Sequence, residues 1–230
     1  GFIPWDDDMD VWMPREDYDK LLAMDVRLES PYFLQTTLND VDYYSSFARL
    51  RNSNTTGILV SKKNKCNNGI YIDIYPLDGL NSNKLQQFLR SKYIRMLNVA
   101  AHAYTFNINP SVITRAIHGI LHLPFIPYDY KKVYKEVNRL ASKIKWDETE
   151  NIGMVVFAPY AHNHNMFDKA DFTDTIWMDF ENTAVPVPKG FNNILKTIYG
   201  DYMSFPPLEK RGTWHAFTFD PDVAYYNYKN

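Results

Sequence analysis

Residues 5–13 read WDDDMDVWM, and polar and apolar side chains alternate along them. A period of two predicts a β-strand, in which Asp8 and Asp10 share one face. Their side chains would lie roughly 7 Å apart, because two residues advance a strand by about that distance. Pro14 is expected to end the strand, and residues 15–25 have the spacing of a helix. The chain therefore opens with an acidic strand that leads into a helix.

A second strand is predicted at residues 69–75, which read GIYIDIY. Asp73 is out of place there, because Asp is disfavoured in strands and its neighbours are Ile and Tyr. Three acids on apolar strands would repel one another unless a cation lay between them. Mg²⁺ binds carboxylate oxygens and keeps positions open for substrate phosphates. We therefore predict that Asp8, Asp10 and Asp73 hold Mg²⁺ (or Mn²⁺) for phosphoryl transfer.

Two other interpretations of the acidic segment stay open at this point. Acid clusters near a chain terminus are often only solvated charge. A calcium loop would use Asp6, Asp8, Asp10 and Asp17 at its first, third, fifth and twelfth positions. Val11 then stands where such a loop needs Gly, and the strand alternation also disagrees with a loop.

Composition and charge exclude several classes of protein. The chain has 230 residues, of which 45% are hydrophobic and 16% aromatic, so it can bury a core and is not a disordered protein. Its formal net charge of -2 argues against a nucleic-acid-binding protein. The chain contains no run of about 18 apolar residues, so the sequence predicts no transmembrane segment. The single cysteine, Cys66, cannot form an intrachain disulfide, which favours a reducing cytoplasm.

The rest of the pattern predicts strands first and then helices. We expect one α+β domain over residues 1–230, because there is no repeat or flexible linker to divide the chain. Gly200 is expected to close the last helix. The predicted strands are 32–38, 46–51, 154–157 and 175–185, and the predicted helices are 82–104, 110–121, 128–143 and 189–199.

A phosphate-bearing substrate also needs basic side chains. Arg15 opens the helix after the acidic strand, although a salt bridge to Asp19 explains it equally well. Arg211 and His215 lie close together in KRGTWH. The other basic candidates are Arg49, Arg51, Lys169 and Lys210, and the aromatic residues nearest the acids, which could stack a base or surround a choline-like cation, are Trp5, Trp12, Tyr71 and Tyr75.

Several of these segments together resemble the LicD family of phosphocholine transferases, which is related to the fukutin-related ribitol-phosphate transferases. The first segment, GFIPWDDDMDVWMPREDYDKLL at residues 1–22, resembles the family signature. The others follow in the family's order at residues 51–55 (RNSNT), 71–80 (YIDIYPLDGL), 180–207 and 209–215 (EKRGTWH).

The resemblance implies a nucleotidyltransferase-like mixed sheet with a helical C-terminal half. It implies transfer of phosphocholine from CDP-choline to a hydroxyl of a cell-surface glycan, such as a teichoic acid, lipopolysaccharide or capsule precursor. Asp8, Asp10 and Asp73 correspond to the family's metal acids, and one of them, with Asp73 as the candidate, is expected to deprotonate the acceptor. The expected substrate-binding residues are Arg15, Arg51, Arg211 and His215.

Other expectations follow from the same resemblance. The acceptor is often lipid-linked in this family, so we expect a cytoplasmic enzyme that can associate with the inner face of the membrane. The family's Gly-rich stretch would lie before Gly1, so we expect the domain to lack its N-terminal helix and Gly-rich loop. Two alternatives remain: a ribitol- or glycerol-phosphate transferase that uses the CDP-alcohol, and an inactive glycan-assembly module.

Overall fold

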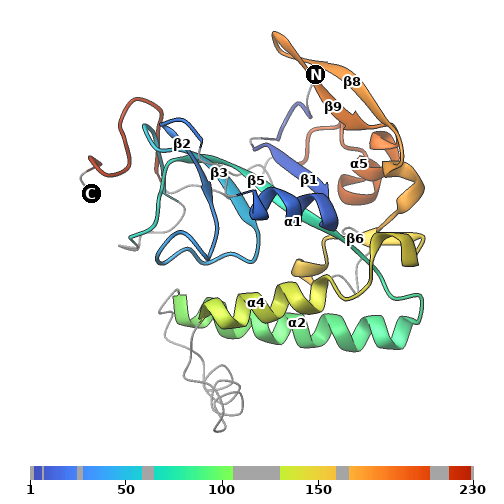
Figure 1. Ribbon diagram of the computed structural model, residues 1–230. Helices are drawn as coiled ribbons and strands as arrows, with labels where there is room; N and C mark the ends of the chain where they lie inside the picture. Colours follow the sequence, from blue (N-terminus) through green and yellow to red (C-terminus); the bar gives the residue numbers. More distant parts are fainter. Residues whose placement is uncertain are drawn as a thin grey trace, which may run out of the picture.

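The computed structural model describes residues 3–6, 8–24, 28–58, 65–105, 130–158, 166–207 and 218–228 (Figure 1). Its main sheet has the strand order β2-β3-β5-β6-β7, with β1 attached to β5. The strands of this sheet are β1 (Asp10–Pro14), β2 (Tyr32–Gln35), β3 (Ala48–Asn52), β5 (Ile70–Gly79), β6 (Asn151–Gly153) and β7 (Met166–Asp168). A separate pair joins β4 (Thr56–Ile58) to β10 (Thr218–Asp220).

Strand β5 organises the sheet, because three other strands pair with it. Its partner β1 runs parallel to it, whereas β3 and β6 run antiparallel. The expectation of a mixed sheet in an α+β arrangement is therefore confirmed. The nucleotidyltransferase-like label stays an expectation.

Both acidic strands differ in length from the sequence prediction. β1 begins only at Asp10, so Asp8 lies in the segment before the strand and not on a shared strand face. β5 continues to Gly79 although we expected it to end at Pro76. Pro76 is the neighbour of Met13 on β1, and among the described strands it pairs with β1 alone, because β3 pairs with β5 only as far as Ile74 and β6 only from Asp78.

Helix α1 (Arg15–Ala23) follows β1 directly and packs on the sheet through Tyr18. Pro14 occupies its N-cap position, where an unmade N–H bond costs nothing. Tyr18 is buried with Ala48 and Ile74 from β3 and β5. This packing fixes the first turn of α1 beside the acidic strand.

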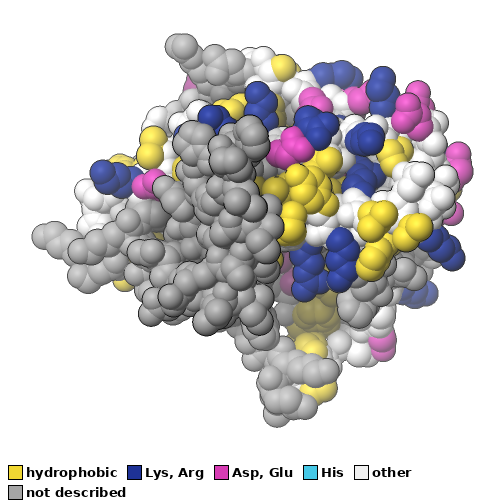
Figure 2. All heavy atoms as spheres, turned by 90° about the horizontal axis from the view of Figure 1, so that it is seen from below, with side chains coloured by type: hydrophobic (Ala, Val, Ile, Leu, Met, Phe, Trp, Pro, Cys, Tyr) yellow, Lys and Arg dark blue, Asp and Glu magenta, His cyan; other side chains and the backbone are white. Residues whose placement is uncertain are grey.

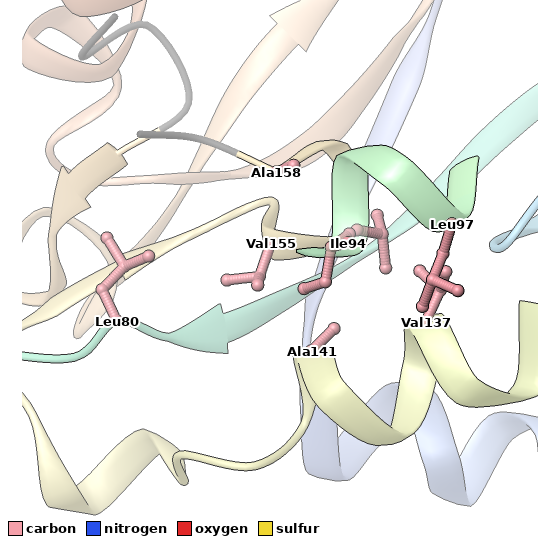
Figure 3. Packing of buried hydrophobic residues seen from close by; sticks show 8 residues of the cluster. Leu80, Ile94, Leu97, Val137, Ala141, Val155 and Ala158 are labelled. Atoms are coloured by element: carbon pink, nitrogen blue, oxygen red, sulfur yellow. The ribbon is translucent and has the colours of Figure 1, made fainter. Parts of the chain in front are cut away.

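Helices α2 (Lys84–Thr105) and α4 (Tyr130–Ala141) lie side by side below the sheet in Figure 1. They share a core with the short helix η2 (Val155–Phe157), and Figure 3 shows how its side chains meet. The residues of this core are Leu80, Ile94, Leu97, Val137, Ala141, Val155, Val156 and Ala158. The strand expected at residues 154–157 is wrong, because a short apolar run suits a buried helical turn as well as a strand. The helix predicted at 110–121 lies outside the described residues.

After α4 the described chain consists mainly of strands and short turns of helix. A hairpin of β8 (Thr175–Phe180) and β9 (Thr183–Pro188) replaces the single strand expected at 175–185, and α5 (Phe191–Tyr199) ends at Gly200 as predicted. The short helices η1 (Trp146–Glu148) and η4 (Lys169–Phe172) complete this part. The expected helical C-terminal half is therefore wrong for the described residues, because the long helices lie in the middle of the chain.

A second buried cluster joins α5 to the sheet. It contains Leu77 of β5, Ile152 of β6 and Ile194 of α5, and Trp12 of β1 packs against it. Strand β1 is thus held in the sheet by β5 and packs against the cluster that contains Ile194 of α5. Among the described residues, no helix is both long and apolar enough to cross a membrane.

Candidate active site

The acids of β1 and β5 meet at the centre of the sheet. Asp10 and Asp73 are direct neighbours across the parallel strands, and Asp8 precedes Asp10 by two residues. The pKa of Asp10 is raised to about 7, first by desolvation and then by the charges of Asp8, Asp73 and Asp6. Asp10 keeps an exposed surface, so solvent screens part of this effect. Three carboxyl groups therefore lie close enough to oppose the ionisation of Asp10.

Asp73 is the least accessible of the three predicted metal acids, and its two oxygens have protein partners. The Arg49 Nε atom donates to Oδ1 at 2.5 Å, and the Tyr75 hydroxyl donates to Oδ2 at 2.8 Å. Both Arg49 and Asp73 are buried. The structure thus pairs Asp73 with a cation of the protein.

The donor set of Asp8 and Asp10 fits a divalent metal ion, since a cation would relieve the repulsion that raises the pKa of Asp10. Within the described ranges, however, no three His, Cys, Asp or Glu side chains already form a metal-binding group. The Arg49–Asp73 pair is consistent with this finding. Asp73 as a metal ligand therefore remains a prediction.

The acids open into a pocket of about 430 Å³. Asp6, Asp8 and Asp10 line one side, and Asp179 of β8 lines the hairpin side. None of the described residues that line the pocket is Lys, Arg or His. The rest of the wall is apolar or aromatic and comes mainly from β8, β9 and α5; it includes Trp12, Met178, Val185, Val187, Phe191, Ile194, Ile198, Tyr199 and Tyr202.

Aromatic residues connect the two sides of the pocket. The Trp5 indole N–H donates to the backbone oxygen of Tyr202 at 2.8 Å, and the Trp5 ring meets the Tyr199 ring edge-on at 5.4 Å between centroids. The Tyr199 hydroxyl lies 3.4 Å from Oδ2 of Asp6. The buried Trp12 Nε1 atom has no hydrogen-bond partner among the described residues, so it is a donor without an acceptor beside the acids.

Arg15, predicted to bind substrate, is engaged in a buried ion pair. Its Nε and Nη2 atoms donate to the two Asp78 oxygens at 2.6 and 2.8 Å. The bond expected to Asp19 also exists, at 3.6 Å, and Nη1 donates to Asn138 of α4. Arg15 does not line the acidic pocket but a second one, between α1 and α4, so its phosphate-binding role remains a prediction.

Arg51 is fully buried beneath the sheet surface. It donates to the side-chain oxygen of Gln35 at 2.8 Å and to the backbone oxygen of Gly69 at 2.5 Å, and it stacks on the Tyr71 ring. Burial and the nearby Arg49 lower its pKa to about 10. These contacts explain its position structurally, and a contact with substrate remains a prediction. The other two predicted substrate-binding residues, Arg211 and His215, lie outside the described residues.

Two residues of the site were not in the predicted set. Arg49 was only one of several basic candidates, but register places it opposite Asp73, and its Nη1 atom is buried without a partner in the described structure. The sequence signal for Arg49 is that Arg49 and Arg51 alternate along a strand next to an acidic strand. No sequence pattern points to Asp179, because only the folded hairpin brings this residue to the pocket.

Comparisons with known proteins found two similarities in sequence. Residues 1–110 match the family model described as LicD/FKTN/FKRP, nucleotidyltransferase domain. Over 221 residues, which cover 94% of this chain and 80% of the relative, the chain is 26% identical to lipopolysaccharide cholinephosphotransferase LicD of Haemophilus influenzae. No solved structure matches the chain significantly. The family match over the first 110 residues and the similarity along nearly the whole sequence support the resemblance to the LicD family.

Proposed function

We propose that the chain transfers phosphocholine from CDP-choline to a hydroxyl group of a glycan. The observation that carries the proposal is the pocket between β1 and the β8–β9 hairpin, which combines four carboxylates with an aromatic wall and no basic residue of the described chain. The relative named above is a lipopolysaccharide cholinephosphotransferase, so we propose a lipopolysaccharide or a similar surface glycan as the acceptor.

The pocket favours a choline group over a neutral polyol. A quaternary ammonium has no hydrogen-bond donor, and proteins bind it with aromatic faces and negative charge. Tyr199 and Tyr202 offer the aromatic surface, and Asp179 supplies a carboxylate on the side away from the β1 acids. A polyol would instead need an array of hydrogen-bonding groups, which the mainly apolar wall does not offer.

Asp8 and Asp10 would hold Mg²⁺ (or Mn²⁺), with Asp73 as the third predicted acid. When bound, such an ion neutralises the diphosphate of the donor and stabilises the transition state of phosphoryl transfer. Arg49 would keep Asp73 oriented, since it holds one carboxylate oxygen and is itself fixed against the Tyr71 ring at 4.3 Å.

In the transfer step, the acceptor hydroxyl forms a bond to the phosphorus that carries choline. The bond between this phosphorus and the bridging oxygen breaks, and its electron pair leaves with CMP. The hydroxyl proton passes to a carboxylate of the site. We propose Asp73 as this proton acceptor, as the sequence predicts.

The test is to incubate the full chain with CDP-choline, Mg²⁺ and a lipopolysaccharide lacking phosphocholine. We expect CMP release and a phosphocholine mass added to the glycan. CDP-glycerol and CDP-ribitol serve as competing donors and should react at least about tenfold more slowly. A higher rate with either of them would assign the chain to that donor, and no reaction with any donor would support the inactive module.

Metal binding is tested separately by thermal unfolding. For a dissociation constant of about 1 mM, 10 mM Mg²⁺ should stabilise the chain by about 1.4 kcal/mol. Asp10→Asn should lose this gain, whereas Asp147→Asn, an exposed acid of η1, should keep it. Equal stabilisation of both variants would remove Asp10 from the metal site.

A further inference from the structure

The two long helices carry a positive charge that the reaction does not use. The chain as a whole has a net charge of -2, but α2 has basic residues and no acidic one, and α4 has Glu136 as its one acid. Figure 2 looks onto the side of the molecule that these helices form, where basic side chains lie beside hydrophobic ones. On α2, Lys84, Lys92 and Arg95 are exposed, whereas Arg90 donates to the backbone oxygens of Gly79, Leu140 and Ala141. On α4, Lys131, Lys132 and Lys135 line the pocket between α1 and α4, and Arg139 is exposed beside Glu136.

Helix α2 has a second apolar face besides the one in the core. Its inner face buries residues such as Ile94. Its outer face leaves 66% of Leu85, 41% of Phe88, 57% of Leu89 and 44% of Tyr93 exposed. Residues three and four positions apart share a helix face, so these four form one continuous stripe. Scattered exposed apolar residues need no explanation, but a continuous apolar stripe marks an interaction surface.

Basic residues stand within and beside this stripe. The Lys92 ammonium lies 5.3 Å from the centroid of the Phe88 ring, and Arg95 and Lys84 are exposed on the same helix. Apolar residues framed by Lys and Arg are typical of helices that lie in the interface of a lipid bilayer. Each basic residue near an anionic leaflet adds attraction to the lipid headgroups.

We propose that the outer face of α2 docks the protein onto the anionic phospholipid headgroups of a membrane. Leu85, Phe88, Leu89 and Tyr93 would enter the boundary between headgroups and acyl chains, and Lys84, Lys92 and Arg95 of the same helix would face the headgroup charge. This docking does not depend on which group the active site transfers.

Charge complementarity selects this partner over two others. A second copy of the chain would bring the basic helices of both copies together, and like charges would repel. A nucleic acid would match the charge but would leave the hydrophobic stripe in water. An anionic bilayer satisfies both features of the surface.

The experiment is sedimentation of the full chain with vesicles of phosphatidylcholine alone or with about a third phosphatidylglycerol. The chain should bind the anionic vesicles and not the neutral ones, and binding should fall at high salt. Leu85→Ser/Leu89→Ser tests the apolar stripe, and Lys92→Glu/Arg95→Glu tests the charge. Each double variant should weaken vesicle binding about tenfold or more.

A matched control distinguishes binding through this surface from nonspecific hydrophobic adsorption to the vesicles. Val41→Ser/Phe219→Ser removes two hydrophobic residues of similar exposure outside α2, and it should bind vesicles like the wild type. Equal binding to both kinds of vesicle, no binding to either, or unchanged binding of both α2 variants would overturn the proposal. So would light scattering that shows a dimer lost in Leu85→Ser/Leu89→Ser, because the stripe would then be a contact between copies. Transferase activity on a water-soluble acceptor, measured without vesicles, reports on the proposed function independently.

Discussion

Asp10 lies in the candidate active site, and the fold changes the pKa of its carboxyl group. Its pKa is raised to about 7 because desolvation and the carboxylates of Asp8, Asp73 and Asp6 all disfavour its ionised form. In the unfolded chain its pKa returns to the ordinary value near 3.8. The folded protein therefore binds a proton at Asp10 more tightly than the unfolded one does, and this contribution to stability is present at low pH and lost as the pH rises through about 7.

The prediction is that Asp10→Asn stabilises the metal-free protein at pH 8 and has little effect at pH 4. At pH 4 the folded wild type already carries a neutral carboxyl at this position, so the amide changes little. Urea unfolding in EDTA at both pH values measures the difference in free energy. Asp147→Asn is the matched control and should show no gain at pH 8. A variant no more stable than the wild type at pH 8 would contradict the electrostatic account of the site.

At this scale the sequence predicted the acids better than the bases. Asp73 stood out because an Asp inside GIYIDIY violates strand preference, and register then placed it beside Asp10. Arg51 and Arg15 were chosen for their charge, but a sequence does not show whether a guanidinium faces a substrate or a protein carboxylate. Only the fold reveals that Arg15 meets Asp78, which is 63 residues away.

At the scale of elements, this ion pair ties the first helix to the central strand. Arg15 begins α1, Asp78 lies near the end of β5, and neither side chain has more than a small exposed surface. A buried charge whose partner is removed costs far more than the pair itself contributes.

We predict that Asp78→Ala lowers the free energy of unfolding by about 3–5 kcal/mol, because Arg15 is left buried without its carboxylate. Asp17→Ala breaks an exposed pair with Lys20 on the same helix and should cost at most about 1 kcal/mol. Denaturant titrations of the two variants make the comparison. Similar small losses in both would mean that solvent reaches Arg15 in the variant and that the pair does not lock α1 to β5.

The β8–β9 hairpin is the element that should decide the donor. It places Asp179 in the pocket wall, and on the proposed function this carboxylate faces the quaternary ammonium. Asp179→Asn should raise KM for CDP-choline about five- to tenfold, while the slow reaction with CDP-glycerol stays unchanged, because only the cationic donor loses an attraction. Asp174→Asn changes an exposed acid at the base of the hairpin and should leave both KM values as they are. An equal effect on the two donors would contradict a role in choline selection.

Elements after α4 were predicted less well for a physical reason. The apolar run at 154–157 is too short for its hydrophobic periodicity to distinguish a strand from a helical turn. In the structure it forms a helical turn whose Val155 and Val156 pack in the core. The sequence predicts one strand over 175–185 because the turn within it contains neither Gly nor Pro. Glu181 adopts a positive φ of 51° there, which the sequence does not announce.

On the scale of the whole molecule, the site is assembled from distant parts of the chain. The family match ends at residue 110, yet one wall of the pocket comes from residues 178–203. The described N-terminal segment closes against this wall, since Trp5 bonds to Tyr202 and packs on Tyr199. The acidic pocket and the basic helices α2 and α4 also separate opposite charges within one molecule. On the two proposals above, this separation would let one protein hold cations at its active site while another face attracts anionic lipid.

The contact between the two parts of the chain leads to a last prediction. Trp5→Ala removes a hydrogen bond and an edge-on aromatic contact that together hold the acidic segment against α5 and its following loop. We expect a loss of about 1–3 kcal/mol in stability and a rise of about tenfold in KM for the donor, because the pocket is no longer held closed.

Trp177→Ala is the matched control, since Trp177 lies on β8 with 71% of its surface exposed and should change neither quantity. Hydrogen exchange of the α5 amides provides a readout without turnover: faster exchange in Trp5→Ala than in Trp177→Ala would follow from a loosened wall. If α5 exchanges equally in both variants and KM is unchanged, the N-terminal segment does not shape the pocket.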